Sequence, residues 1–199
     1  MENPITADPE LTAADRAALC GLARATLAAH LAGRPLPPIP AVPGAGLKRG
    51  AFVTLYERGA LRGCIGHIVA DRALGPVVQE MAIAAARDDP RFAAVEPDEL
   101  ALITVEISVL LEPVLLPAPV DAARIVVGRD GVIVRRERHI GLLLPQVAAE
   151  QGWGPEAFLA AACRKAGLPP DAWREPAAQV LAFQADVFGE VGGRGESAG

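Results

Sequence analysis

The sequence predicts an α+β fold, and three observations support this class. The chain has 199 residues, enough for one domain of ordinary size or two small lobes. Hydrophobic residues make up 51% and charged residues 22%, which excludes a disordered chain. Segments with helical spacing of apolar residues are interspersed with short alternating segments typical of strands. The predicted order is helix, hairpin, helix, strand, hairpin, strand, two helices and a final strand, which is an α+β arrangement.

The first half of the chain is predicted to contain two helices around a hairpin. Thr12 with Asp15 in the first turn is typical of a helix N-cap, and Gly33 stands where a C-cap glycine ends such a helix. Residues 34–48 contain five prolines and two glycines, which excludes a helix or an interior strand there. The elements that follow are strands at residues 51–57 and 61–69, joined as a hairpin, and a helix at 73–87.

The second half is predicted to contain a central strand, a hairpin, two helices and a final strand. The pair Asp130-Gly131 suits a turn with positive φ, so residues 125–134 are expected to form the hairpin. Prolines at positions 145 and 155 suit the first turns of the helices. The remaining expected elements are strands at 102–111, 141–144 and 179–190 and helices at 146–151 and 156–165.

Charge and cysteine usage narrow the functional classes. The net charge of −5 argues against a protein whose whole surface follows a nucleic-acid backbone. The three cysteines are widely spaced and form no CxxC pair, so neither a disulfide framework nor a four-thiolate zinc site is predicted. The sequence also has an acidic N-terminus and no apolar run long enough to cross a bilayer. We therefore expect a cytoplasmic protein with no membrane segment.

The segment 61–66, Leu-Arg-Gly-Cys-Ile-Gly, is the first candidate site. Two glycines inside a strand pattern indicate a bulge or the close approach of another backbone or a ligand. Strand alternation places Arg62, Cys64 and Gly66 on one face. A cation beside a thiol favours the thiolate, so Cys64 could attack a substrate whose carboxylate or phosphate is held by Arg62, with Gly63 and Gly66 leaving room for the ligand. The alternative is a small core cysteine and a structural ion pair of Arg62.

Two further positions are candidates for substrate binding. Asp89 and Arg91 lie on a proline-containing loop, where Arg91 could recognise an anion, or the pair could pin the loop with Phe92 in the core. Glu106 lies within an apolar strand, so its carboxylate must face a polar side, be paired with an arginine, or have a raised pKa.

A metal or cofactor has little support from these motifs. Cys64 and His67 have a C-x-x-H spacing, but side chains three apart on a strand point to opposite faces unless a bulge intervenes, so no metal is expected. Phosphate-loop and dinucleotide fingerprints are absent from the sequence, and the cofactor is unknown.

Residues 61–66 match the LRGCIG signature of the AMMECR1 family, which is protein A of the AmmeMemoRadiSam system, and the chain resembles this family. The resemblance covers roughly residues 12–190. Other segments that are similar to the family pattern occur in its order at 52–55, 89–92, 98–100, 128–132 and 144–153.

The resemblance implies a fold and a functional context. The fold is a single domain over 12–190 with two unequal lobes, built from duplicated β-rich and helical units around a barrel-like, mostly antiparallel sheet. Residues 1–11 and 191–199 are then flexible tails, and the LRGCIG strand lies near a cleft between the lobes. The function implied is a role in a modification pathway beside a radical SAM protein and a Memo-type protein.

Three functional hypotheses remain open from the sequence. The first is an enzyme or enzyme subunit that acts on a small or nucleotide-like substrate, with Cys64 as the reactive group and Arg62 and Arg91 as anion holders. The second is a non-catalytic adaptor that binds a Memo-type or radical SAM partner. The third is an RNA-binding component of a modification system.

Overall fold

The computed structural model describes residues 11–190, which form two compact units. The N-terminal unit comprises residues 11–109 and 186–190, and the C-terminal unit comprises residues 110–185. The two expected tails lie outside the described residues, apart from Leu11, which is 6% exposed and belongs to the core of the N-terminal unit. The single domain over residues 12–190 stays a prediction. No described helix has the length and apolarity that crossing a membrane requires.

The N-terminal unit begins with a capped helix. Thr12 and Asp15 form a reciprocal capping box that satisfies free N–H groups at the start of α1. The exclusion of any helix from residues 34–48 was wrong for the short helix α2, because Pro43 occupies its first turn, where no N–H is needed. The elements of this unit are α1 (Ala13–Leu31), α2 (Pro43–Gly46), β1 (Ala51–Glu57), β2 (Ala60–His67), α3 (Leu74–Arg87), the 3₁₀-helix η1 (Pro97–Ala101), β3 (Ile103–Leu110) and β8 (Ala185–Gly189).

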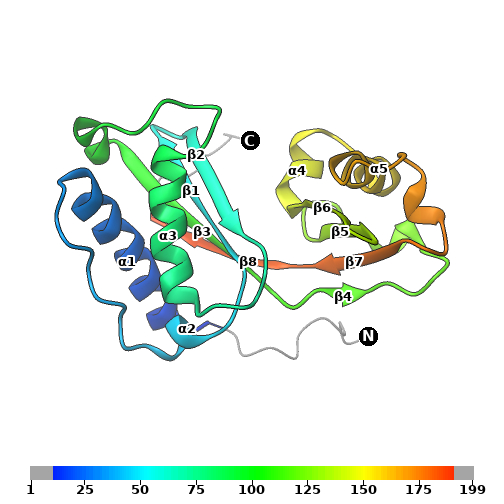
Figure 1. Cartoon of the computed structure of the whole chain (residues 1–199), viewed down its shortest axis with the longest axis horizontal. Coiled ribbons are helices and arrows are strands. Elements are labelled where there is room, and N and C mark those ends of the chain that lie inside the picture. The colour runs from blue at the N-terminus through cyan, green and yellow to red at the C-terminus, as the bar shows by residue number, and fades with distance from the viewer. Residues whose placement is uncertain (1–10, 191–199) are drawn as a thin grey trace. The chain divides into compact units, whose positions relative to one another are not determined.

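The sheet of the N-terminal unit has the strand order β2-β1-β3-β8, with β1 antiparallel to both β2 and β3. Helix α3 packs on β1 and β2, and α1 lies beside α3 (Figure 1). Alternate residues of the strands point into this core, as the alternation in the sequence predicts. They are Ala51, Val53 and Leu55 on β1 and Ile103, Val105, Ile107 and Val109 on β3.

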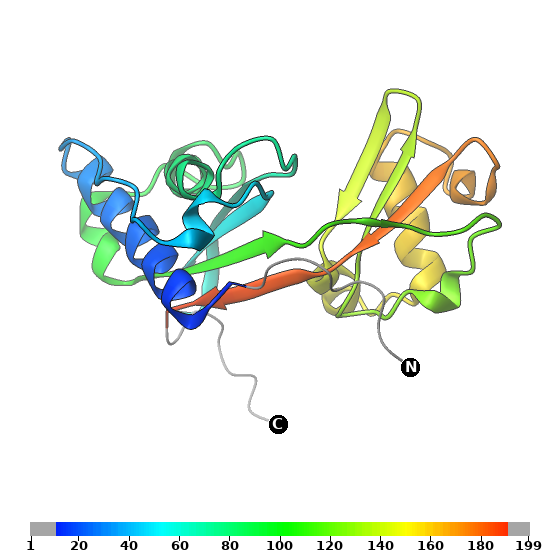
Figure 2. The same cartoon turned by 90° about the horizontal axis from the view of Figure 1, so that it is seen from below.

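The C-terminal unit has a sheet with the order β4-β7-β5-β6, on which α5 packs against β5 and β6 (Figure 2). Phe158 and Leu159 of α5 are fully buried among strand residues such as Val132 and Val134. The elements are β4 (Val114–Leu115), η2 (Ala122–Arg124), β5 (Gly131–Arg136), β6 (His139–Leu143), α4 (Pro145–Glu150), α5 (Pro155–Lys165), η3 (Ala172–Arg174) and β7 (Gln179–Phe183).

The hairpin expected at residues 125–134 was misplaced. Asp130 does not make the hairpin turn: its carboxylate accepts a hydrogen bond from the backbone N–H of Val126 at 2.9 Å and closes the loop before β5. The hairpin joins β5 to β6 instead, and Glu137 at its turn has φ of 55°. An Asp side chain that bonds the backbone can organise a loop as well as a hairpin turn, so the Asp-Gly pair was ambiguous.

The final strand predicted at 179–190 is divided between the two sheets. Residues 179–183 form β7, which pairs with β4 and β5, whereas residues 185–189 form β8 beside β3. The alternating pattern runs through the division, so it carried no signal of the change at Gln184.

The two units repeat one topology. Each contains a hairpin, then helices, then a strand that pairs with the first hairpin strand, giving the orders β2-β1-β3 and β6-β5-β7. A fourth strand, β8 or β4, completes each sheet. The α+β class is therefore correct. The barrel-like sheet was wrong, because each sheet has only four strands and ends in two edges, so that neither closes on itself.

Candidate functional site

A row of polar side chains crosses the face of the N-terminal sheet that points away from α3. Thr54 on β1 lies directly opposite Cys64 on β2 and, on its other side, directly opposite Glu106 on β3. We call these three residues the polar row. Opposite residues on antiparallel strands have Cβ atoms about 5 Å apart, so their side chains are neighbours. Thr54 and Glu106 are only 5% and 8% exposed, and Cys64 is partly exposed.

Hydroxyl groups surround the polar row. Thr54 Oγ1 donates to Cys64 Sγ at 3.3 Å, and Tyr56 Oη donates a long hydrogen bond of 3.4 Å to Glu106 Oε1. Thr104 and Ser108 lie two residues before and after Glu106 on β3, so they share its face. Their hydroxyl oxygens are buried and make no hydrogen bond within the part of the chain that the structure describes. Buried hydroxyl groups without a protein partner are uncommon.

Arg62 does not lie beside the thiol as strand alternation suggested. The β1–β2 pairing shifts register at this point, with Leu55 opposite Gly63 and Tyr56 opposite Leu61, so Arg62 is the extra residue of a bulge. A bulge redirects the side chain of its extra residue. The guanidinium forms two hydrogen bonds to Glu99, at 2.7 and 3.1 Å, and two to the carbonyl oxygens of residues 93 and 94. These contacts use four of its five N–H donors, so Arg62 holds the loop before η1.

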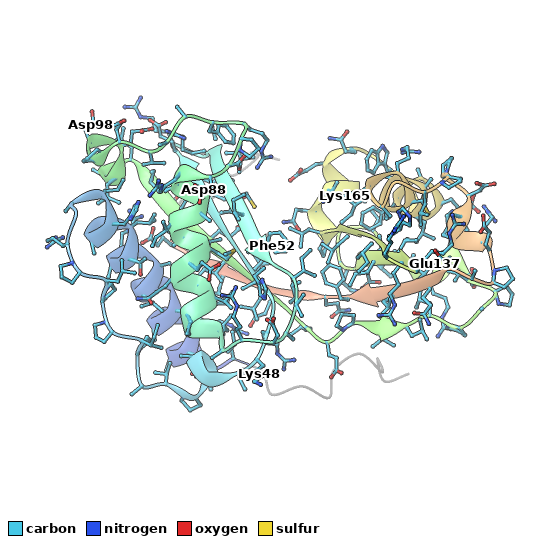
Figure 3. All side chains as sticks on the ribbon, in the orientation of Figure 1. Lys48, Phe52, Asp88, Asp98, Glu137 and Lys165 are labelled. Atoms are coloured by element: carbon cyan, nitrogen blue, oxygen red, sulfur yellow. The ribbon has the colours of Figure 1, made fainter. Side chains whose placement is uncertain are left out.

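The two glycines of the motif serve packing within the protein. A Cβ atom on Gly63 would lie 2.1 Å from the carbonyl oxygen of Ala85, so this glycine allows α3 to approach β2. Gly63 is thus on the helix side of the sheet, and a ligand on the polar face cannot reach it. A Cβ on Gly66 would lie 2.2 Å from the ring of Phe52, the residue opposite it on β1 (labelled in Figure 3). The space that we expected a ligand to use at Gly66 is filled by this ring.

The second predicted candidate, the Asp89–Arg91 pair, does lie beside Cys64. Asp89 is 4% exposed, and its Oδ2 accepts a hydrogen bond of 2.9 Å from the backbone N–H of Cys64. Arg91 donates from Nε to Oδ1 at 2.9 Å and from Nη2 to Oδ2 at 2.7 Å. These hydrogen bonds hold the pKa of Asp89 well below its usual value. Phe92 is half-buried and outside the core clusters, with Arg91 5.4 Å above its ring.

The electrostatics of Cys64 differ from the sequence-based expectation. Burial raises the pKa of its thiol, and this effect outweighs the hydrogen bond from Thr54 and the charge of Arg91, which both lower the pKa. The carboxylates of Asp89 and Glu106 raise it further. The nearby cation is thus Arg91 rather than Arg62, and the resting group at neutral pH is the thiol, because desolvation disfavours the charged form more than one cation favours it.

The other two cysteines have different surroundings. Cys20 packs against the core of the N-terminal unit, where burial and the charge of Glu190 raise its pKa to about 11. Cys163 on α5 is fully buried in the C-terminal core. Among the three cysteines, Cys64 combines partial exposure with a hydroxyl donor and a cation that both favour its thiolate.

The C-terminal unit provides an internal reference for the polar row. Gly141 on β6 corresponds to Gly63, because its Cβ would lie 2.1 Å from the carbonyl oxygen of Ala162 on α5. The residue after each glycine begins a row across three strands. In the C-terminal unit Leu142 lies opposite Ile133, and Ile133 lies opposite Leu181. The equivalent positions are therefore entirely apolar, and the topology does not require polar residues there.

Sequence reasoning identified part of this site. Cys64, Arg91 and Glu106 lie at or beside the polar row, while Arg62 and Gly63 point elsewhere. It missed Thr54 and its hydroxyl neighbours on β1 and β3. A signal was present in the sequence, because AFVTLYE has Phe, Thr and Tyr at alternate positions and ITVEISVL has Thr, Glu and Ser at alternate positions.

Comparison with known proteins agrees with the fold. A protein of Methanosarcina barkeri is 43% identical over 187 residues, covering 90% of this chain and 92% of its own length. A protein of Methanothermobacter thermautotrophicus is 50% identical over 148 residues, covering 73% and 77%. The crystal structure of an uncharacterised protein from Pyrococcus horikoshii superimposes with a TM-score of 0.80 and 41% identity, covering 87% of this chain and 90% of that one.

The family model named AMMECR1 matches residues 20–188, which include every strand of both sheets except the last residue of β8. The names of the relatives state no activity. On this match and these identities, the chain belongs to the AMMECR1 family.

Proposed function

We propose that this protein is an enzyme or enzyme subunit in which Cys64 is the reactive group and Arg91 holds an anionic part of the substrate. The observation that carries the proposal is the contrast between Cys64–Thr54–Glu106 and the equivalent row Leu142–Ile133–Leu181. Apolar side chains fill this row in the C-terminal unit, so the packing of the fold does not require polar groups there. We therefore attribute the thiol, the hydroxyl and the buried carboxylate of the N-terminal unit to a chemical function. We propose a modification pathway with Memo-type and radical SAM proteins as the setting.

The arrangement suits addition of a thiol to a carbonyl carbon. The sulfur forms a bond to carbon, the π electron pair of the carbonyl moves onto oxygen, and that oxygen takes the thiol proton. Thr54 supports this step because its hydroxyl donates to the sulfur and favours developing negative charge there. No cofactor is needed for the step.

Site-resolved alkylation tests the proposal. The folded protein is treated with iodoacetamide at pH 7.5, and mass spectrometry of its peptides gives a separate rate for each cysteine. Cys64 is expected to react faster than Cys20 and Cys163, which serve as controls in the same chain. Equal or slower labelling of Cys64 in the folded protein would contradict the proposal.

The adaptor hypothesis has one observation in its favour. Strand β2 is an edge of its sheet, and large apolar residues at and just beyond its ends are exposed: Leu61 by 39%, Ile68 by 43% and Val69 by 58%. Exposed apolar groups beside an edge strand are typical of partner binding. The adaptor predicts that Memo-type or radical SAM proteins still co-purify with the Cys64→Ser variant, whereas loss of such a complex would contradict it. RNA binding stays a prediction, tested by a salt-sensitive gel shift.

A further inference from the structure

Arg91 is held in one orientation beside Cys64. Asp89 is buried and makes two side-chain hydrogen bonds to Arg91, and its Oδ1 also accepts from the Arg91 backbone N–H at 3.1 Å. The same carboxylate accepts from the Cys64 backbone N–H. A guanidinium fixed in this way has lost its conformational freedom before any ligand arrives, which lowers the entropic cost of binding.

One edge of the guanidinium remains available. Asp89 occupies the Nε–Nη2 side, and within the described residues Nη1 has no hydrogen-bond acceptor. The side chain of Arg91 is 54% exposed although Asp89 is buried. The outer edge, formed by N–H groups of Nη1 and Nη2, presents two parallel donors in one plane. This geometry matches the two oxygens of a carboxylate.

The guanidinium of Arg91 is close to the backbone of Cys64. Asp89 Oδ2 contacts both the Cys64 backbone nitrogen and Arg91 Nη2, so these two nitrogens are within about 6 Å of one another. The Asp89–Arg91 ion pair also affects which anion is favoured. Because Asp89 already offsets the charge of Arg91, a singly charged anion is favoured over a phosphate dianion.

We infer that the outer edge of Arg91 is a carboxylate-binding subsite and that the substrate is a small carboxylic acid whose electrophilic carbon lies close to its carboxylate. The inference rests on the proposed function of Cys64 and adds the chemical class of the substrate. Asp89 acts as a positioning residue, because it fixes Arg91 relative to the backbone of Cys64.

Paired alkylating probes test the subsite. Iodoacetate carries a carboxylate next to its reacting carbon, and iodoacetamide is its neutral analogue. In both reactions the sulfur bonds to carbon, iodide leaves with the electron pair of the broken bond, and the thiol proton passes to buffer. We define the rate ratio as the iodoacetate rate divided by the iodoacetamide rate. The rate ratio at Cys64 in the folded protein, compared with that of free glutathione, measures how strongly the protein attracts the carboxylate of the probe.

The ratio in the native protein is expected to exceed that of glutathione, and Arg91→Gln should lower it about 3- to 10-fold, as expected for loss of one charge at this distance. Arg72→Gln is the matched control, because it removes an arginine of the same unit that pairs with Glu80. This control should leave the ratio unchanged. A native ratio no higher than that of glutathione, or one that Arg91→Gln leaves unchanged, would overturn the inference.

A competition experiment on the native protein needs no variant. Acetate should slow iodoacetate at Cys64 in a saturable manner and have a smaller effect on iodoacetamide. No protection by acetate, or stronger protection by inorganic phosphate at equal concentration, would overturn the carboxylate assignment. Failure of Cys64 to react with iodoacetamide would instead contradict the proposed function itself, so the two failures are distinguishable.

Discussion

The N-terminal and C-terminal units pack a helix on a four-stranded sheet in the same way, but one face of the sheet is polar in the first unit and apolar in the second. In both, a helix approaches the second hairpin strand at a glycine, Gly63 or Gly141, and a Cβ there would lie 2.1 Å from a helix carbonyl oxygen. The next residue is Cys64 in one unit and Leu142 in the other. The shared glycine belongs to the fold, whereas the change from an apolar to a polar row is a property of the N-terminal unit alone.

The two units also share a buried Asp–Arg pair. Each unit has a buried aspartate that holds an exposed arginine by two hydrogen bonds and also accepts from a backbone N–H. Asp130 pairs with Arg129 and accepts from Val126, in the loop before β5. Asp89 pairs with Arg91 and accepts from Cys64. The pair stabilises a loop in both units, but only the pair in the N-terminal unit bonds to the backbone of a cysteine.

The largest effect is expected from the two glycines. Gly63→Ala and Gly141→Ala should each lower the free energy of unfolding by about 3 kcal/mol, because the new methyl group meets a backbone carbonyl that cannot move without displacing a helix. Urea denaturation gives the loss, and hydrogen exchange should place it in the altered unit. Gly21→Ala on α1, where a Cβ meets nothing within 4 Å, is the control and should stabilise slightly. A loss of less than about 1 kcal/mol in the free energy of unfolding at either glycine would contradict an equivalent packing role for Gly63 and Gly141.

An intermediate, pH-dependent effect is expected at the aspartates. The hydrogen bonds from Arg91 depress the pKa of Asp89 in the folded state, so its carboxylate contributes stability above the unfolded value of about 4, and the contribution is lost as pH falls below it. Asp89→Asn should therefore cost about 1 kcal/mol at pH 7 and less at pH 3, measured by urea denaturation.

Asp130→Asn is the counterpart of this variant in the C-terminal unit. Its pKa is also lowered, because hydrogen bonds from Arg129 and Val126 outweigh the opposing effect of burial. A similar pH-dependent cost is expected, but only Asp89→Asn should change the rate of Cys64 alkylation. Equal effects of both variants on that rate would contradict a specific influence of the Asp89–Arg91 pair on the Cys64 thiol.

The smallest change in stability is expected in the polar row. Thr54→Val should alter the free energy of unfolding by less than about 0.5 kcal/mol, since valine keeps the shape and the hydroxyl contacts a weakly bonding sulfur. Its loss should nevertheless slow Cys64 alkylation at pH 7.5 about threefold, because the thiol pKa rises further. Thr26→Val, which removes a buried hydroxyl of α1 with no described partner, is the control and should leave the rate unchanged. An unchanged alkylation rate in Thr54→Val would show that the Thr54 hydroxyl does not influence the reactivity of Cys64.

Some of the site was visible in the sequence because it depends on local pattern. The alternation of β1 and β3 placed Glu106 on a separate face from its apolar neighbours, and the loop Asp89-Pro90-Arg91 suggested an ion pair. The position of Arg62 was not visible. The glycines of residues 61–66 correctly indicated a bulge or a close backbone approach, but they did not show which residue is the extra one. Pairing with Leu55 and Tyr56 makes Arg62 the extra residue, and one such residue reverses the face on which a side chain lies.

The sequence by itself determined the fold class, the core-facing positions of the strands, most helices and the family, because these follow from periodicity, capping and a specific local motif. Tertiary structure alone decided which strands share a sheet, where the last strand divides at Gln184, and which arginine lies beside Cys64. These features depend on contacts between residues far apart in the chain. A period of two repeats identically whether a strand continues in one sheet or enters another, so only pairing distinguishes the two.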